Sequence, residues 1–92
     1  MSVTIGTAPG ETAGFVPAGM SVPAGKAVQL TFLNESAVAH NLVFTTGVTA
    51  GTDAIVDPGT SQTLSIGPLA AGTYRFVCTI HEEMVGELVV EG

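Results

Sequence analysis

The chain has 92 residues, of which 46% are hydrophobic and 11% are charged, and its formal net charge is −6 at pH 7. This length indicates a single domain over residues 1–92, and the composition excludes an intrinsically disordered chain, which would be polar and rich in charge. Because Lys26 and Arg75 are the only basic side chains, the sequence argues against nucleic acid or an anionic membrane as partner, whereas the acidic charge suits a basic protein partner or solubility alone.

Short apolar runs separated by Gly and Pro predict many short strands joined by turns, with little helix, as in a sandwich or barrel. The first strand is expected over residues 3–5. The next apolar run, residues 15–22, contains Pro17 and Gly19, which is typical of an irregular edge strand. A turn follows at residues 23–25.

Residues 27–33 alternate between apolar and polar side chains, which predicts a half-buried strand. The apolar face of this strand consists of Val28, Leu30 and Phe32. A turn is expected at residues 34–36, and a further strand over residues 40–44. Residues 45–61 are rich in Thr, Gly, Ala and Asp, so we expect an irregular segment with a short helical turn.

The remaining strands are expected over residues 63–66, 73–78 and 87–90. In the second of these, Tyr74, Phe76 and Cys78 share one face, because side chains alternate along a strand. Cys78 should therefore lie at the end of a buried strand, held by packing, with a short loop after it.

Cys78, His81 and Met84 bring a thiolate, an imidazole and a thioether into one seven-residue segment. A trigonal site of two His and one Cys, with a weak axial Met, is the ligand set of an electron-transfer copper centre. His40 is the only other His in the chain. The chain thus contains the His and Cys residues that such a site needs, and none beyond them.

Each of these residues also has a structural explanation when it is taken alone. A free Cys is usually buried as a small apolar residue, and Met commonly fills gaps in a core. Zinc is an alternative metal, because Cys and His suit it, although a thioether does not and structural zinc prefers more thiolates. Copper accounts for all four residues together.

The segment 78–90 resembles the ligand loop and final strand of the cupredoxins, the small blue copper proteins, including amicyanin, plastocyanin and pseudoazurin. The spacing Cys-x2-His-x2-Met is similar to the short loop of amicyanin, and residues 38–41 resemble the first His ligand with its following Asn. The resemblance implies an all-β, Greek-key β-sandwich of about seven to eight strands with one copper ion at one end. It also implies that His40, Cys78 and His81 are equatorial ligands and that Met84 is the axial ligand.

The same resemblance implies roles for residues beside the ligands. The Asn41 side chain should link the two ligand loops through Thr79, while its backbone N–H points at the Cys78 sulfur. Many short-loop relatives have Pro where this chain has Ile80, so we predict that the Ile80 N–H gives the sulfur a second hydrogen bond and raises the reduction potential.

Glu82 and Glu83 lie inside the ligand loop and leave three interpretations open. They are two solvated charges on a turn, or carboxylates that stabilise Cu(II) and place negative charge beside the electron port. In the third interpretation, a carboxylate replaces Met84 as a ligand.

We expect a monomeric electron carrier and not an enzyme, since a site with every position filled has none open for substrate. His81, flanked by Ile80 and Val85, is expected to form the docking and electron-entry patch for transient redox partners such as a cytochrome c or a copper or haem enzyme. A copper-delivery module, or a cupredoxin domain of a larger copper oxidase or nitrite reductase, is the alternative.

The sequence alone does not decide the compartment in which the protein works. The sequence has no apolar run of the roughly 18 residues that a transmembrane helix needs, and its first residues do not predict a signal peptide. A single Cys cannot form an internal disulfide, so it says nothing about redox compartment. A cytoplasmic protein and a mature exported domain remain possible, and we expect a periplasmic or other extracytoplasmic location.

Overall fold

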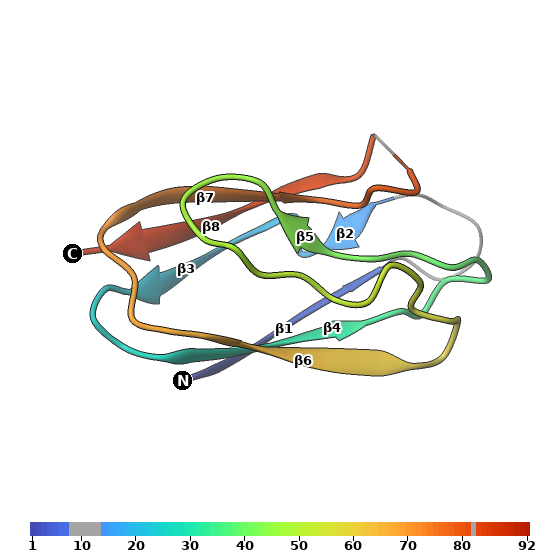
Figure 1. Cartoon of the computed structure of the whole chain (residues 1–92), viewed down its shortest axis with the longest axis horizontal. Helices are drawn as coiled ribbons and strands as arrows, with labels where there is room; N and C mark the ends of the chain where they lie inside the picture. Colours follow the sequence, from blue (N-terminus) through green and yellow to red (C-terminus); the bar gives the residue numbers. More distant parts are fainter. Residues whose placement is uncertain (8–13, 82) are drawn as a thin grey trace.

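The computed structural model describes residues 1–7, 14–81 and 83–92. In this part of the chain, eight strands form two sheets that face each other, and no helix is present (Figure 1). The strands are β1 (Ser2–Thr7), β2 (Phe15–Val16), β3 (Gly19–Pro23), β4 (Val28–Leu33), β5 (Val43–Phe44), β6 (Ser61–Ile66), β7 (Gly72–Val77) and β8 (Val85–Glu91). The predicted all-β sandwich is confirmed, and these residues contain no helix that could cross a membrane.

Both sheets are mixed and contain four strands, in the orders β2-β1-β4-β6 and β3-β8-β7-β5. β1 runs parallel to β4, and β3 runs parallel to β8, while the other pairs are antiparallel. Parallel neighbours that are far apart in sequence require the chain to cross between the sheets. This is the crossing pattern that a Greek-key sandwich needs.

The predicted edge strand over residues 15–22 is present but divided between the two sheets. Phe15–Val16 pairs with β1 at the edge of one sheet, and Gly19–Pro23 pairs with β8 at the edge of the other. The chain changes sheet at Pro17, which has no N–H to offer to a ladder. The interruption that the sequence predicts is therefore the crossing point.

The core lies between the sheets and is built by alternating side chains. Val28, Leu30 and Phe32 of β4 are all buried, as the sequence predicts. Phe76 of β7 packs between Phe15 and Phe44, with ring centroids 4.9 Å and 5.5 Å away. Cys78 follows directly after β7 and is 1% exposed, so the packed strand fixes the start of the ligand loop.

The expected strand over residues 40–44 is shorter than predicted, and the helical turn expected within residues 45–61 is wrong. Only Val43–Phe44 pairs with β7. The His40 backbone instead forms an isolated antiparallel bridge with Val56, with N···O distances of 3.3 Å and 2.9 Å. The irregular segment after β5 thus returns to support His40.

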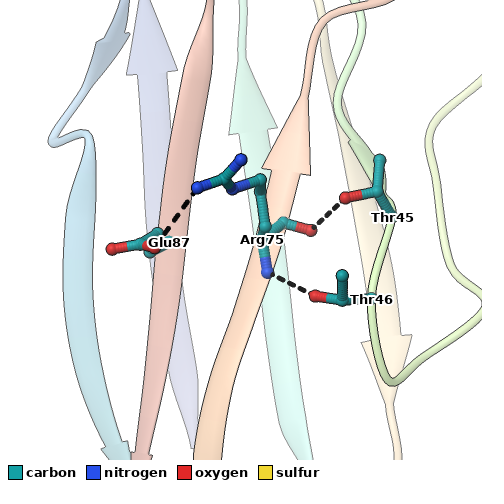
Figure 2. Close-up of polar contacts among 4 residues, drawn as sticks. All are labelled: Thr45, Thr46, Arg75 and Glu87. Carbon is teal, nitrogen blue, oxygen red and sulfur yellow. Dashed lines mark hydrogen bonds and ion pairs between the residues drawn. The ribbon is translucent and has the colours of Figure 1, made fainter.

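The side chains of two threonines extend the short pairing between β5 and β7, as Figure 2 shows: the Thr45 hydroxyl faces the Arg75 carbonyl oxygen, and the Thr46 hydroxyl faces the Arg75 N–H. The Thr45 N–H donates to the Arg75 carbonyl oxygen at 2.9 Å, and the Arg75 N–H donates to Thr46 Oγ1 at 3.0 Å. The Arg75 guanidinium lies 4.0 Å from the Glu87 carboxylate, and both side chains are exposed, so this ion pair contributes little. The contacts of Thr45 and Thr46 with the Arg75 backbone are what tie the end of β5 to the sheet.

Replacing Gly86 with Ala is expected to lower the free energy of unfolding by about 1–3 kcal/mol. A Cβ at this position of β8 would meet the Phe76 ring and lie 2.7 Å from the Ala18 carbonyl oxygen. Phe76 is fully buried between two other rings and has no room to yield. Urea denaturation measures the change. Gly67→Ala is the control, because a Cβ there meets nothing within 4 Å; equal midpoints for the two variants would contradict the packing argument.

Candidate metal centre

The four predicted ligands come from two loops at the same end of the sandwich (Figure 1). His40 lies between β4 and β5, and the other three lie between β7 and β8. The second loop is closed by its own backbone: the Cys78 N–H donates to the Met84 carbonyl oxygen at 3.1 Å, and the Met84 N–H donates to the His81 carbonyl oxygen at 3.0 Å. The short spacing of the ligands therefore folds into a tight, hydrogen-bonded turn.

Three donor atoms converge at this end. Cys78 Sγ lies 3.8 Å from His40 Nδ1 and 3.9 Å from His81 Nδ1, and the three donors all lie within 4.8 Å of one another. A nitrogen at about 2.1 Å and a sulfur at about 2.3 Å from one metal, with a trigonal angle between them, would be about 3.8 Å apart, which matches both sulfur–nitrogen distances. The observed spacing fits one shared metal ion.

Burial separates His81 from the rest of the centre. His40, Cys78 and Met84 are buried, whereas His81 is partly exposed. Burial, with a smaller contribution from the nearby His81, lowers the pKa of His40 below its ordinary value. The lowered pKa favours the neutral imidazole of His40, which is the form that binds a metal.

The hydrogen bonds around the centre include only part of the predicted set. Asn41 Nδ2 donates to Thr79 Oγ1 at 2.7 Å, and the Thr79 N–H donates to Asn41 Oδ1 at 2.8 Å. This reciprocal pair links the two ligand loops.

The predicted hydrogen bonds to the Cys78 sulfur are not found among the described residues, either from the Ile80 N–H or from the Asn41 N–H. The polar neighbours of the sulfur are instead the two imidazole nitrogens. The expectation that Ile80 raises the potential through such a bond therefore has no contact to support it.

The residues expected at the docking patch lie on the surface beside the centre. Ile80 and Val85 are each 40% exposed, although both are large and apolar, and Glu83 is exposed as well. Glu82 lies outside the described residues. Exposed apolar side chains thus precede His81 in the ligand loop, at Ile80, and begin the strand after that loop, at Val85.

The turn expected at residues 34–36 contains a residue whose importance the sequence interpretation missed. Asn34 is fully buried, and its side chain makes hydrogen bonds to Thr7, Ser36, Val38 and Val56. A signal for this was present, because Asn34 continues the alternation of Val28, Leu30 and Phe32 toward the core. A buried amide in phase with an apolar face must find hydrogen-bond partners inside the protein.

A β-sandwich with one Cys, two His and one Met gathered at its end defines a copper-binding class of protein. The cupredoxin-like domain family matches residues 6–90. Plastocyanin from Sambucus nigra is 34% identical over 89 residues, covering 83% of this chain and 86% of that protein. Amicyanin-alpha from Methylorubrum extorquens is 39% identical over 72 residues, covering 76% of this chain and 58% of that protein. The chain belongs to the cupredoxin family, whose members are small copper proteins that transfer electrons.

Solved structures of similar shape give the same assignment. Auracyanin from Roseiflexus castenholzii superimposes with a TM-score of 0.85 at 25% identity, covering 99% of this chain and 97% of that one. The copper-containing nitrite reductase from Thermus scotoductus matches all of this chain but only 23% of its own, with a TM-score of 0.76 at 21% identity. That likeness shows the fold alone, and it shows that the fold also occurs within enzymes.

Proposed function

We propose that residues 1–92 act as one cupredoxin domain that carries single electrons through one copper ion. His40 Nδ1, Cys78 Sγ and His81 Nδ1 would hold the ion, with Met84 as the weak axial ligand. The observation that carries this proposal is the convergence of the three donor atoms within 4.8 Å. When bound, copper supplies the electron that is exchanged, by changing between Cu(I) and Cu(II).

The protein residues keep the centre rigid and largely dry. Cys78 is fixed by the end of β7 and by its hydrogen bond to the Met84 backbone, while His40 is fixed by its bridge to Val56. A preorganised site reorganises little when its charge changes. Buried His40 and Cys78 exclude water, and the partly exposed His81 ring is the route by which an electron enters and leaves.

We infer that the domain is not an enzyme. Catalysis on a bound molecule needs an open coordination position, and the four side chains would fill the centre. A domain of a larger copper enzyme usually contributes to a second metal site as well. The chain has only two His and one Cys. The proposed copper centre uses all three, so no His or Cys is left for a second metal site.

We propose that partners dock transiently over His81, Ile80 and Val85. Exposed apolar side chains around a redox centre suit a small interface that forms and separates quickly. The net charge of −6 favours a basic redox protein, such as a cytochrome c or a copper or haem enzyme, and speeds the encounter. We further propose a monomer that works outside the cytoplasm, in the periplasm or an equivalent compartment, as the resemblance to exported cupredoxins suggests.

Adding Cu(II) to the copper-free protein is expected to produce an intense visible band from sulfur-to-copper charge transfer, saturating at one copper per chain. Cyclic voltammetry of the loaded protein should show one reversible one-electron wave. The control is the Zn(II)-loaded protein, which has no such band or wave because zinc has no accessible redox change. The absence of an intense band at one equivalent of Cu(II) would reject the electron-carrier assignment.

Copper exchange separates a carrier from a delivery module. Two of the three converging residues are buried, so we expect slow transfer of copper to a chelator in solution. Release within seconds would instead favour delivery. The same preparation of loaded protein serves both measurements.

A further inference from the structure

Asn34 lies directly after β4 and uses its whole side-chain amide inside the protein. Its Oδ1 accepts hydrogen bonds from Thr7 Oγ1 at 3.2 Å, from the Ser36 N–H at 3.0 Å and from Ser36 Oγ at 2.9 Å. Its Nδ2 donates to the carbonyl oxygens of Val38 at 3.0 Å and Val56 at 2.8 Å. Both amide protons are thus used, which is the full donor capacity of the group.

The two carbonyl groups that Asn34 binds stand on either side of His40. Val38 precedes His40 by two residues in the same loop. Val56 is the bridge partner of His40: the His40 N–H donates to the Val56 carbonyl oxygen, and the Val56 N–H donates back to that of His40. One side chain therefore fixes both the segment that carries His40 and the segment that supports it.

The Asn34 backbone strengthens the same connection. The Asn34 N–H donates to the Thr60 carbonyl oxygen at 3.0 Å, and the Gly59 N–H donates to the Asn34 carbonyl oxygen at 2.8 Å. Both partners lie in the turn that follows Val56. The irregular segment opposite His40 is consequently held to the end of β4 at several points.

The ring of His40 has little else to orient it. Its Nε2 is buried and has no hydrogen-bond partner among the described residues. Metal-binding His residues usually donate their other ring N–H to a carboxylate or carbonyl group, which fixes the orientation of the ring. Without that contact, the direction of Nδ1 toward Cys78 depends on packing and on the position of the His40 backbone.

We propose that Asn34 is a positioning residue for the metal centre, which holds the His40 backbone through Val38 and Val56 so that Nδ1 faces Cys78 Sγ. The expected effect of Asn34 on copper binding rests on the proposed function. The restraint of the His40 backbone by Asn34 does not, because it applies to the protein without metal.

In the copper-free protein, Asn34→Ala is expected to speed amide hydrogen exchange at His40 and Val56 well beyond the change at other amides. The matched control is Val28→Ala, a buried substitution at the opposite end of β4. It should lower global stability without speeding hydrogen exchange at His40 and Val56 more than at other amides. Equal exchange at His40 and Val56 in both variants, after correction for their global stability, would overturn the proposal.

In the copper-loaded protein, Asn34→Ala is expected to weaken Cu(II) binding by about 10- to 100-fold, the usual effect of losing a residue that supports a ligand. The charge-transfer band should shift and the reduction potential should rise, because Cu(I) tolerates a loosened imidazole better than Cu(II) does. Val28→Ala should leave the band and the potential unchanged. An unshifted band and potential in Asn34→Ala would contradict a positioning role.

A milder variant keeps the test decisive if Asn34→Ala does not fold. Ser36→Ala removes the hydroxyl whose single proton is shared between two acceptors, Asn34 Oδ1 at 2.9 Å and the Val38 carbonyl oxygen at 2.7 Å. It should give a smaller increase in exchange at the same two amides, and no increase would count against the proposal. A wild-type protein that binds no copper would refute the proposed function, whereas the exchange experiment would still decide whether Asn34 holds His40.

Discussion

Replacing Cys78 with Ser is expected to abolish the intense visible band of the Cu(II)-loaded protein and its reversible one-electron wave. The thiolate is the charge-transfer donor and a strong ligand, whereas a serine hydroxyl stays protonated at neutral pH and offers only weak lone pairs. Cys78 is 1% exposed, so the new hydroxyl is buried. Leaving it unpaired should cost about 1–3 kcal/mol of unfolding free energy in the copper-free protein.

Met84→Leu is the matched variant, because it changes the axial ligand and keeps a buried apolar side chain of similar volume. The band should persist, since Cys78 is intact. The potential should rise, because the axial ligand tunes it and a lost donor disfavours Cu(II). Absorption spectra and voltammetry of the two variants check this. A Cys78→Ser protein that keeps the band would place the chromophore elsewhere and remove the basis for a copper–thiolate centre.

The convergence of His40, Cys78 and His81 was predictable because the residues that carry this chemistry are scarce in the chain. With one Cys and two His, a His₂Cys site leaves no choice of residues. The alternation of Val28, Leu30 and Phe32 likewise predicts β4, and Pro17 predicts the interruption between β2 and β3. In each case the property belongs to the residues themselves or to their neighbours in the chain.

What the sequence did not predict depends on contacts between distant segments. The bridge between His40 and Val56 joins two irregular loops that show no periodicity, so nothing local indicates it. The direction of the Ile80 N–H depends on the backbone dihedral angles of the ligand loop, and residue type does not determine them. Asn34 is intermediate: it was assigned to a turn, although the alternation of β4 could have indicated its burial, and its partners could be found only in the folded chain.

The stability of the copper-free protein is expected to fall as the pH is lowered below about 6.5, because of His40. Burial and the neighbouring His81 lower the pKa of His40 in the folded state from its ordinary value of 6.5. Between that lowered pKa and 6.5, the unfolded chain binds a proton that the folded chain does not. The free energy of unfolding therefore rises with pH in this window and is fully present above 6.5, with a slope for one group of at most about 1.4 kcal/mol per pH unit.

Urea denaturation of the protein with a metal chelator, between about pH 5 and pH 8, measures this slope above the range in which carboxylates titrate. In His40→Leu the slope should disappear, because no imidazole is buried at that position. In His81→Gln it should shrink without vanishing, since burial is the larger cause of the lowered pKa and the charge of His81 the smaller one. Wild type and His40→Leu with the same slope would show that His40 is not the group that is held neutral. In that case a proton would compete with copper for the buried His40 imidazole.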